Sequence, residues 1–349
     1  MNSENKINVL IVDDSALMRR MITDILNNHP KINVIGTASN GKIALDQLEK
    51  LKPDVITLDI EMPLMNGIET LKEINHIRPL PVIMFSSLTK AGAETTLQAL
   101  ESGATDFITK PDPKLGQTFE SIKDELISKV LAAAEINQSK ISQTIQKISS
   151  KVSIINRSSK STNIKTVVIG TSTGGPQALK SVVPYLPEDL PAQILIVQHM
   201  PPKFTDLLAQ RLDKLSQISV KEAQEGDLLK RGLALMAPGN YHMCVEDNNS
   251  IKLNQEPPLW GVRPAIDLTL SSAAKIFNKN LICVILTGMG HDGTQGAKAV
   301  KKFGGYCIAE DKSTCVIYGM PKSVIDAGCA DKIVPLPEVA NAIIEAVYR

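Results

Sequence analysis

The segment Ile-Asn-Val-Leu-Ile-Val-Asp-Asp, residues 7–14, gives the first indication of the fold. Its apolar, largely β-branched run ends in two carboxylates, which is typical of a buried strand that reaches a polar loop. Similar runs follow, separated by segments of helical period such as Ala16–Asn27 and Gly41–Leu51. The predicted strands are Ile7–Val12, Ile32–Ala38, Asp54–Leu58, Pro81–Phe85 and Asp106–Ile108. Strands that alternate with helices predict an α/β fold, here a doubly wound, five-stranded parallel sheet.

Charged and hydroxyl side chains stand at the ends of these strands, namely Asp13, Asp14, Asp59, Ser86 and Lys110. The loops at the carboxyl ends of parallel strands form the ligand crevice, so these side chains are expected to converge. Clustered carboxylates repel one another unless a hard cation neutralises them, and Mg²⁺ prefers such oxygen ligands. Asp59 is then the predicted nucleophile toward a phosphoryl group, with Lys110 pairing with the phosphate and Ser86 donating to it. The sequence therefore predicts a phosphate-accepting switch.

Length and composition limit the remaining classes of protein. At 349 residues the chain is long enough for two domains, each with its own core. A net charge of +1, without a basic recognition helix, argues against a nucleic-acid partner. Five cysteines without CxxC spacing indicate a reduced, cytoplasmic protein. No apolar run approaches the ~20 residues that cross a bilayer, so membrane insertion is not expected.

Residues 131–164 are predicted to link two domains. The stretch is rich in Ser, Gln, Asn and Lys, which is typical of a flexible tether. Apolar residues nevertheless recur in it at alternating steps of four and three, which would form a stripe along a helix. These residues are Ile141, Ile145, Ile148, Val152 and Ile155. The sequence leaves both interpretations of the linker open.

A second α/β domain is predicted over residues 165–347. Its expected strands are Thr166–Gly170, Gln193–Gln198 and Leu281–Thr287, and its expected helices include Pro176–Val183 and Pro264–Phe277. The pattern predicts a Rossmann-like parallel sheet. As in the first domain, polar residues follow the strands directly.

Those polar residues suggest nucleophilic hydrolysis. Ser172 lies in Gly-Thr-Ser-Thr-Gly-Gly (170–175) just before a helix, His199 follows the next strand, and Asp292 lies in Gly-Met-Gly-His-Asp-Gly (288–293). A serine needs a base at neutral pH, which His199 could supply, and Asp292 could orient the imidazole. The same glycine-rich loop could instead cradle a phosphate, with Ser172 as a helix cap. A phosphate- or nucleotide-binding response regulator without hydrolase activity is therefore the alternative.

The first region resembles the receiver domain of two-component response regulators over residues 5–130. The resemblance rests on the Asp13-Asp14 pair, Asp59 in LDIEMPLMNG, Ser86 in MFSSLT and Lys110 in FITKP. It implies a flavodoxin-like fold, phosphorylation of Asp59 by a histidine kinase, and Mg²⁺ as the cofactor. The implied metal ligands are Asp13, Asp14, Asp59 and the carbonyl of Glu61, and the implied switch residues are Ser86, Phe107 and Lys110. For Phe107 taken alone, an ordinary core aromatic is the favoured interpretation.

The second region resembles the catalytic domain of chemotaxis protein-glutamate methylesterases. GTSTGG, QHM-PP and LTGMGHDG carry the resemblance. It implies Ser172 as nucleophile, His199 as base and Asp292 as its partner, with Met289 donating to the oxyanion and Thr173 near the site. The implied function is phosphorylation-activated hydrolysis of glutamyl methyl esters on the cytoplasmic domains of chemoreceptors, with release of methanol. Deamidation of selected receptor glutamines, sensory adaptation in chemotaxis, a chemotaxis histidine kinase as phosphodonor and no cofactor for the hydrolase are implied as well.

Three aromatic residues near these motifs receive no catalytic role from the sequence. His242 and His291 are expected to be surface or loop residues. Trp260 is the only tryptophan of the chain, and it follows Pro257-Pro258. We expect it to pack or to contact a peptide rather than to take part in catalysis.

Overall fold

The computed structural model describes residues 6–111, 118–136 and 164–349. The chain divides into two compact units, Met1–Gln143 and Thr144–Arg349, and each is described by itself. The predicted apolar stripe of the linker lies in residues 137–163, outside the described residues. None of the helices in the described ranges is both long and apolar enough to cross a bilayer.

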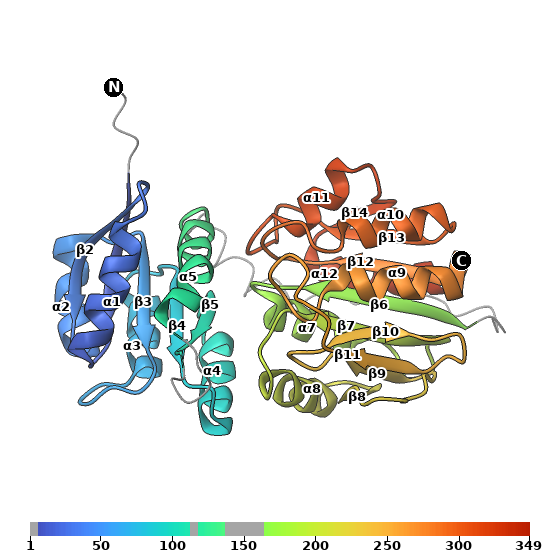
Figure 1. Ribbon diagram of the computed structural model, residues 1–349, viewed down its shortest axis with the longest axis horizontal. Helices are drawn as coiled ribbons and strands as arrows, with labels where there is room; N and C mark the ends of the chain where they lie inside the picture. Colours follow the sequence, from blue (N-terminus) through green and yellow to red (C-terminus); the bar gives the residue numbers. More distant parts are fainter. Residues whose placement is uncertain (1–5, 112–117, 137–163) are drawn as a thin grey trace. The chain divides into compact units, whose positions relative to one another are not determined.

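The first unit is a five-stranded parallel sheet in the order β2-β1-β3-β4-β5 (Figure 1). This order is the flavodoxin-like arrangement, and the predicted fold class is confirmed. Each strand lies within a residue or two of its predicted position, because buried β-branched runs leave little freedom in register. The strands are β1 Ile7–Val12, β2 Ile32–Ala38, β3 Val55–Asp59, β4 Val82–Ser86 and β5 Asp106–Thr109.

Five helices cover the two faces of this sheet. The apolar sides of α1 and α5 share one core with the strands, and α2, α3 and α4 lie against the other face. The helices are α1 Ala16–Asn27, α2 Gly41–Leu51, α3 Gly67–Ile77, α4 Lys90–Glu101 and α5 Phe119–Ala134. The last helix continues past residue 130, where the sequence predicted that the receiver ends.

The second unit contains a seven-stranded, fully parallel sheet in the order β14-β13-β12-β6-β7-β9-β8. A separate antiparallel hairpin, β10–β11, was not anticipated from the sequence. The sheet strands are β6 Lys165–Thr171, β7 Ala192–Gln198, β8 Ser219–Glu222, β9 Leu233–Met236, β12 Leu281–Ile285, β13 Tyr306–Glu310 and β14 Lys332–Val334. The hairpin strands are β10 His242–Val245 and β11 Ile251–Asn254.

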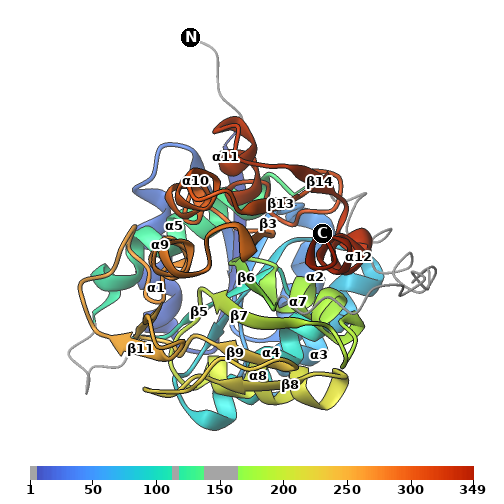
Figure 2. The same ribbon diagram turned by 90° about the vertical axis from the view of Figure 1, so that its right-hand side faces the viewer.

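Helices cover both faces of the second sheet as well. Figure 2 shows α9 and α10 on one side and α7 and α12 on the other. The hairpin joins the core on the side of α9. The helices are α7 Gly175–Val182, α8 Phe204–Leu215, α9 Ile266–Phe277, α10 Thr294–Lys302, α11 Met320–Asp326 and α12 Leu336–Val347, with short 3₁₀ turns η2 Val183–Tyr185 and η3 Asn278–Asn280.

The strand order changes direction beside β6. The chain proceeds from β6 to β7 on one side, and later returns to β12 on the other side of β6. In open parallel sheets, ligands bind at the carboxyl ends of strands where the order reverses in this way. The loops after β6, β7 and β12 are the three that carry the predicted serine, histidine and aspartate.

Candidate active site and phosphoacceptor site

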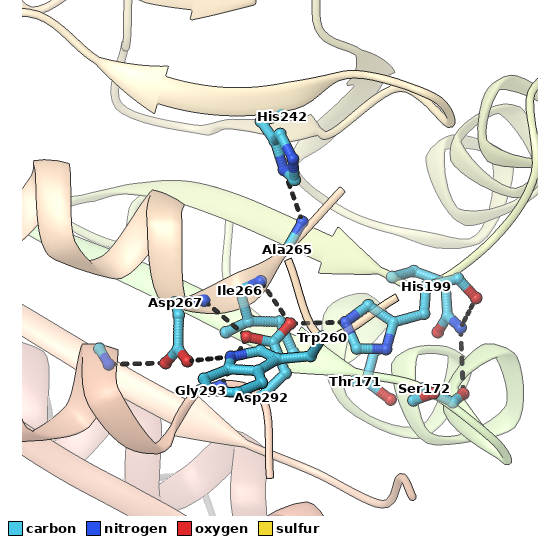
Figure 3. Close-up of polar contacts among 12 residues, drawn as sticks. Thr171, Ser172, His199, His242, Trp260, Ala265, Ile266, Asp267, Asp292 and Gly293 are labelled. Atoms are coloured by element: carbon cyan, nitrogen blue, oxygen red, sulfur yellow. Dashed lines mark hydrogen bonds and ion pairs between the residues drawn. The ribbon is translucent and has the colours of Figure 1, made fainter. Parts of the chain in front are cut away.

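His199 and Asp292 form the best-defined contact of the second unit. His199 follows β7, Asp292 precedes α10, and their side chains meet with Nε2 2.7 Å from Oδ2 (Figure 3). Because a carboxylate only accepts hydrogen bonds, this contact places the imidazole proton on Nε2. The second ring nitrogen, Nδ1, is left with its lone pair, as a general base requires.

Asp292 is almost completely buried, yet it is held as an anion. Its Oδ2 also accepts the Ile266 N–H at 2.7 Å, and its Oδ1 accepts the N–H groups of Asp267 and Gly293, both at 2.9 Å. Burial acts to raise the pKa of Asp292, but His199 and these backbone donors outweigh burial and lower it. The donors at positions 266 and 267 belong to the N-terminus of α9, where a negative charge is favoured.

Ser172 lies at the turn between β6 and α7. Its N–H donates to the Thr287 carbonyl at 3.0 Å, and its carbonyl accepts the Gln198 side-chain amide at 3.0 Å. Gly288 packs so closely that a Cβ on it would lie 2.7 Å from the Ser172 Cβ. The loops after β6, β7 and β12 are thereby joined around the serine.

The structure brings the predicted serine into the same loop cluster as His199 without a direct bond. Among the hydrogen bonds of the described residues, none joins Ser172 Oγ to His199. In Figure 3 the imidazole lies between Asp292 and the loop of Thr171 and Ser172 in the view. Catalytic hydrogen bonds are often long in ligand-free enzymes and tighten around substrate. The role of Ser172 therefore stays a prediction.

The two predicted accessory residues occupy different environments. Met289 is 36% exposed, and its amide N–H makes none of the hydrogen bonds found among the described residues, as an oxyanion donor requires. Thr173 is buried, and its carbonyl accepts the Thr287 hydroxyl at 2.9 Å. That bond anchors Thr173 in the loop next to the serine.

Sequence reasoning missed Asp267 and misplaced His242. Asp267 is buried beside Asp292, and its carboxylate accepts the Gly296 N–H at 2.6 Å and the Trp260 indole N–H at 3.0 Å. Burial raises the pKa of Asp267, and the charge of Asp292 adds to the effect. An acid in the first turn of a helix usually serves the helix dipole, so the sequence offered no sign of this second role.

The expectation that His242 is a surface or loop residue was wrong. His242 lies in β10 and is fully buried, with Nδ1 accepting the Ala265 N–H at 3.2 Å and Nε2 facing the Pro257 carbonyl at 3.2 Å. Both ring nitrogens are satisfied in the neutral imidazole, which is why burial is tolerated. The alternation of the sequence His-Met-Cys-Val could have indicated a strand position.

Glu310 is another buried carboxyl group behind the site. Located at the end of β13, it accepts the Thr287 N–H at 2.8 Å and the Thr314 hydroxyl at 2.9 Å. Burial raises the pKa of Glu310 to about 7, against the effect of those two donors. Since Thr287 contacts the Ser172 amide, Glu310 supports the loop on which the predicted nucleophile rests.

In the first unit, the predicted strand-end residues converge. Lys110 Nζ lies 2.7 Å from Asp59 Oδ2 and 3.4 Å from Asp13 Oδ2. Burial raises the pKa of Asp59 to about 6 although Lys110 acts to lower it, and burial also raises the pKa of Asp13. Burial acts to lower the pKa of Lys110, but Asp59 and Asp13 outweigh burial and raise it.

The carboxylates of this site fit a divalent cation. Oxygens of Asp13, Asp14 and Asp59 lie within 4.8 Å of one another, and Asp14 alone of the three is exposed. The buried Oδ2 atoms of Asp13 and Asp59 face the Lys110 ammonium, and no other donor among the described residues bonds them. The Glu61 N–H lies 3.4 Å from Asp59 Oδ1, so the residue with the predicted carbonyl ligand folds back toward the cluster. Oxygen donors of this kind suit Mg²⁺.

The predicted switch residues lie nearby in a defined arrangement. Ser86 and Lys110 line a cavity beside Asp59. The Ser86 hydroxyl is directed to α4, where it contacts the Thr96 hydroxyl at 2.5 Å and the Gly92 carbonyl at 3.2 Å. Phe107 is buried, with the Lys129 ammonium 5.3 Å from its ring centroid and bonded to its carbonyl.

Comparisons with known proteins agree with both sites. A response regulator receiver domain model matches residues 9–119, and a CheB methylesterase model matches residues 167–343. A protein-glutamate methylesterase/protein-glutamine glutaminase of Symbiobacterium thermophilum is 46% identical over 354 residues, covering 99% of this chain and 98% of the relative. A protein of the same name from Clostridium acetobutylicum is 47% identical over 347 residues, covering 98% of each.

A solved structure matches the second unit alone. The Thermotoga maritima CheB methylesterase catalytic domain is 49% identical with a TM-score of 0.51, and the match covers 52% of this chain and 98% of that domain. Its fold therefore agrees with the seven-stranded sheet described above. With both family models matched in the predicted order and relatives aligned along nearly its full length, this chain belongs to the protein-glutamate methylesterase/protein-glutamine glutaminase family with an N-terminal receiver domain.

Proposed function

We propose that this protein hydrolyses glutamyl methyl esters on chemoreceptors and deamidates selected receptor glutamines, at a rate set by phosphorylation of Asp59. The observation that supports this most directly is the buried His199–Asp292 pair, 2.7 Å between Nε2 and Oδ2, beside the loop of Ser172. A phosphate-binding loop has no need of an oriented imidazole. The phosphate-binding alternative is therefore not favoured.

The first half-reaction forms an acyl-enzyme. Ser172 Oγ attacks the glutamyl carbonyl carbon while His199 Nδ1 takes the hydroxyl proton, and Asp292 stabilises the imidazolium. The carbonyl oxygen becomes an anion, and the Met289 N–H would donate a hydrogen bond to it. The tetrahedral species then collapses, and methoxide leaves as methanol with the proton from His199.

The second half-reaction regenerates the enzyme with the same groups. His199 takes a proton from water, the hydroxide attacks the acyl carbon, and Ser172 leaves with that proton to yield the glutamate. With a glutamine side chain, ammonia departs in place of methanol and the later steps are unchanged. One site therefore suffices for both reactions.

The receiver controls this chemistry through Asp59. The carboxylate would attack the phosphoryl group of a chemotaxis histidine kinase, and Lys110 would pair with the product. Mg²⁺ bound by Asp13, Asp14, Asp59 and the Glu61 carbonyl would screen the charges that meet there. Ser86 would then give up its hydrogen bonds to residues of α4 and donate to a phosphoryl oxygen instead. The arrangement of Phe107 would change with it. Such partners place the enzyme in the cytoplasm.

Methanol release from methyl-labelled receptor membranes tests the proposal. We expect release by the full chain to rise when a small-molecule phosphodonor and Mg²⁺ are added, and to vanish in Ser172→Ala. Ser181→Ala is the matched control, because its hydroxyl only bonds the Gln177 carbonyl within α7. Release that persists in Ser172→Ala would exclude the serine as nucleophile. Absence of release in every state would instead favour the phosphate-binding alternative.

A further inference from the structure

Trp260 occupies the tip of a tight turn that tryptophan rarely adopts. Leu259 and Val262 exchange two backbone hydrogen bonds, at 3.2 and 3.0 Å, across the two residues between them. Those residues, Trp260 and Gly261, both have positive φ, +55° and +79°. Two-residue hairpins with this backbone favour Asn, Asp and Gly, and a bulky side chain there is strained. Local preference therefore does not explain the tryptophan.

Burial does not explain it either. The side chain is 51% exposed, although tryptophan is normally among the most buried residues by area. Residues that break local rules without a packing gain are expected at functional sites. We therefore looked to the contacts of the indole for its role.

Both contacts of the indole lead to the catalytic loop. Its Nε1–H donates to Asp267 Oδ2 at 3.0 Å, and the Asp267 N–H in turn donates to Asp292 Oδ1 at 2.9 Å (Figure 3). The indole ring meets the ring of His291 edge-on, with centroids 4.3 Å apart at 67°. His291 directly precedes Asp292 and lies two residues after Met289. The exposed indole is thus fixed relative to the base and the predicted oxyanion donor.

We propose that Trp260 is a specificity-determining residue, whose exposed ring packs against the polypeptide that flanks the glutamyl ester. A fixed, half-exposed tryptophan offers a large apolar surface with little conformational freedom left to lose on binding. Met289, on the same loop as His291, is 36% exposed as well. The inference rests on the proposed function, since it requires a protein substrate.

The competing role for Trp260 is structural support of other residues of the site. The indole could serve only to keep Asp267 and Asp292 in place, without touching substrate. The two roles differ in their dependence on the substrate: a contact to the flanking polypeptide matters only for the receptor, whereas support of Asp292 matters for every ester.

Two substrates separate these roles. We expect Trp260→Ala to lower kcat/KM for methylated receptor membranes about tenfold or more, as for removal of an aromatic anchor. Hydrolysis of a small soluble ester, N-acetylglutamate γ-methyl ester, should stay within about twofold of wild type, since such an ester lacks the polypeptide. Trp260→Phe should recover part of the loss on membranes. Tyr185→Ala is the control, because this 38% exposed aromatic precedes β7 and so lies near the end of the sheet where that strand begins, away from the loops that follow the strands. Equal losses on both substrates, or no loss on either, would overturn the proposal.

The tryptophan also reports binding directly, because it is the only one in the chain. In full-length Ser172→Ala, we expect a tryptophan-free methylated receptor fragment to shift the emission to shorter wavelength as the indole leaves water. Unchanged emission at saturating fragment would refute the contact. This readout needs no turnover, so it distinguishes failure of the contact from failure of the proposed function, which would appear as inactivity of the wild-type enzyme on both esters.

Discussion

Each of the two sites of this molecule contains a deeply buried carboxylate, but the pKa values of these two carboxylates shift in opposite directions. Asp59, the last residue of β3, is 2% exposed, and Asp292, in the loop after β12, is 3% exposed, so both lie at the carboxyl ends of parallel strands. Burial raises the pKa of Asp59 to about 6, whereas the pKa of Asp292 is lowered in spite of burial. Burial alone therefore does not determine the charge of either group.

The difference lies in the hydrogen-bond donors. Three backbone N–H groups and His199 surround Asp292, so its anion is satisfied by the fold itself. Asp59 receives one long backbone contact from Glu61 and shares Lys110 with Asp13. Asp292 thus has the donors that its predicted orienting role requires, while Asp59 keeps oxygens available for the predicted cation and phosphoryl group. The two arrangements fit the predicted roles, orientation of His199 by Asp292 and phosphoryl transfer to Asp59.

Asp292→Asn would break this comparison most severely. The amide NH₂ of asparagine must face His199 or one of the backbone N–H groups that now donate to the carboxylate, so it would favour the wrong tautomer or move the loop. We expect kcat for the ester to fall about 10³- to 10⁴-fold, by analogy with other triads. Asp326→Asn is the control, because that carboxylate is exposed on α11 and its one ion pair with a described residue is to Lys322. If kcat falls by less than about tenfold, the backbone donors that hold Asp292 as an anion are not needed to orient His199.

Asp59→Asn tests the predicted phosphoacceptor. Asparagine accepts no phosphoryl group, so we expect the ratio of rates with and without phosphodonor to become one. Intact mass should confirm that no phosphoryl group is gained. Asp46→Asn removes an exposed carboxylate from α2 of the same unit, and it should respond to the donor like the wild type. Activation that survives in Asp59→Asn would place the phosphoacceptor elsewhere.

The sequence was sufficient for residues that stand at strand ends. Asp13, Asp59 and Lys110 converge, and His199 meets Asp292, because parallel strands bring their carboxyl ends to one edge. This rule needs only the positions of the strands and the polar residues at their ends or in the loops that follow them. It therefore predicted both clusters without any knowledge of tertiary contacts.

The same rule could not predict the groups that tune these clusters. Asp267, Glu310 and His242 act through hydrogen bonds to backbone N–H groups that are distant in sequence. Which N–H group lies opposite a given side chain depends on how helices and hairpins pack on the sheet, and no local pattern records that. The hairpin turn at Trp260 shows the same limit, since positive φ at a tryptophan contradicts local preference.

Glu310→Gln extends the comparison to a third buried carboxyl group, which accepts hydrogen bonds from Thr287 and Thr314. Its pKa is about 7 in the folded protein and near 4.5 when unfolded, so the folded state binds the proton more tightly between these values. Stability from this group is therefore present at acidic pH and is lost as pH rises through about 7, by up to about 3 kcal/mol. Glutamine carries no such charge. We expect the Tm of Glu310→Gln relative to wild type to increase from about pH 5 to about pH 8.

Glu338→Gln serves as the control for that series. Glu338 is exposed in the first turn of α12, so its replacement should give a Tm difference that varies little over the same range. A pH-independent Tm difference for Glu310→Gln would show that the buried group stays in one protonation state across the range. The number of hydrogen-bond donors, which separates the pKa of Asp59 from that of Asp292, would then not account for the pKa of Glu310.

Thr96→Val is expected to give the smallest effect, because it removes only one partner of the predicted switch residue Ser86. Thr96 is fully buried, and its hydroxyl lies 2.5 Å from that of Ser86. Without the Thr96 hydroxyl, Ser86 has one hydrogen bond fewer to break before it can bond the phosphoryl group. The free-energy cost of that change falls by about 1 kcal/mol. Half-maximal activation should then need about two- to fivefold less phosphodonor. Thr95→Val is the matched control, since its exposed hydroxyl only bonds the Ala91 carbonyl. A higher requirement in Thr96→Val would mean that the Ser86–Thr96 contact belongs to the activated arrangement.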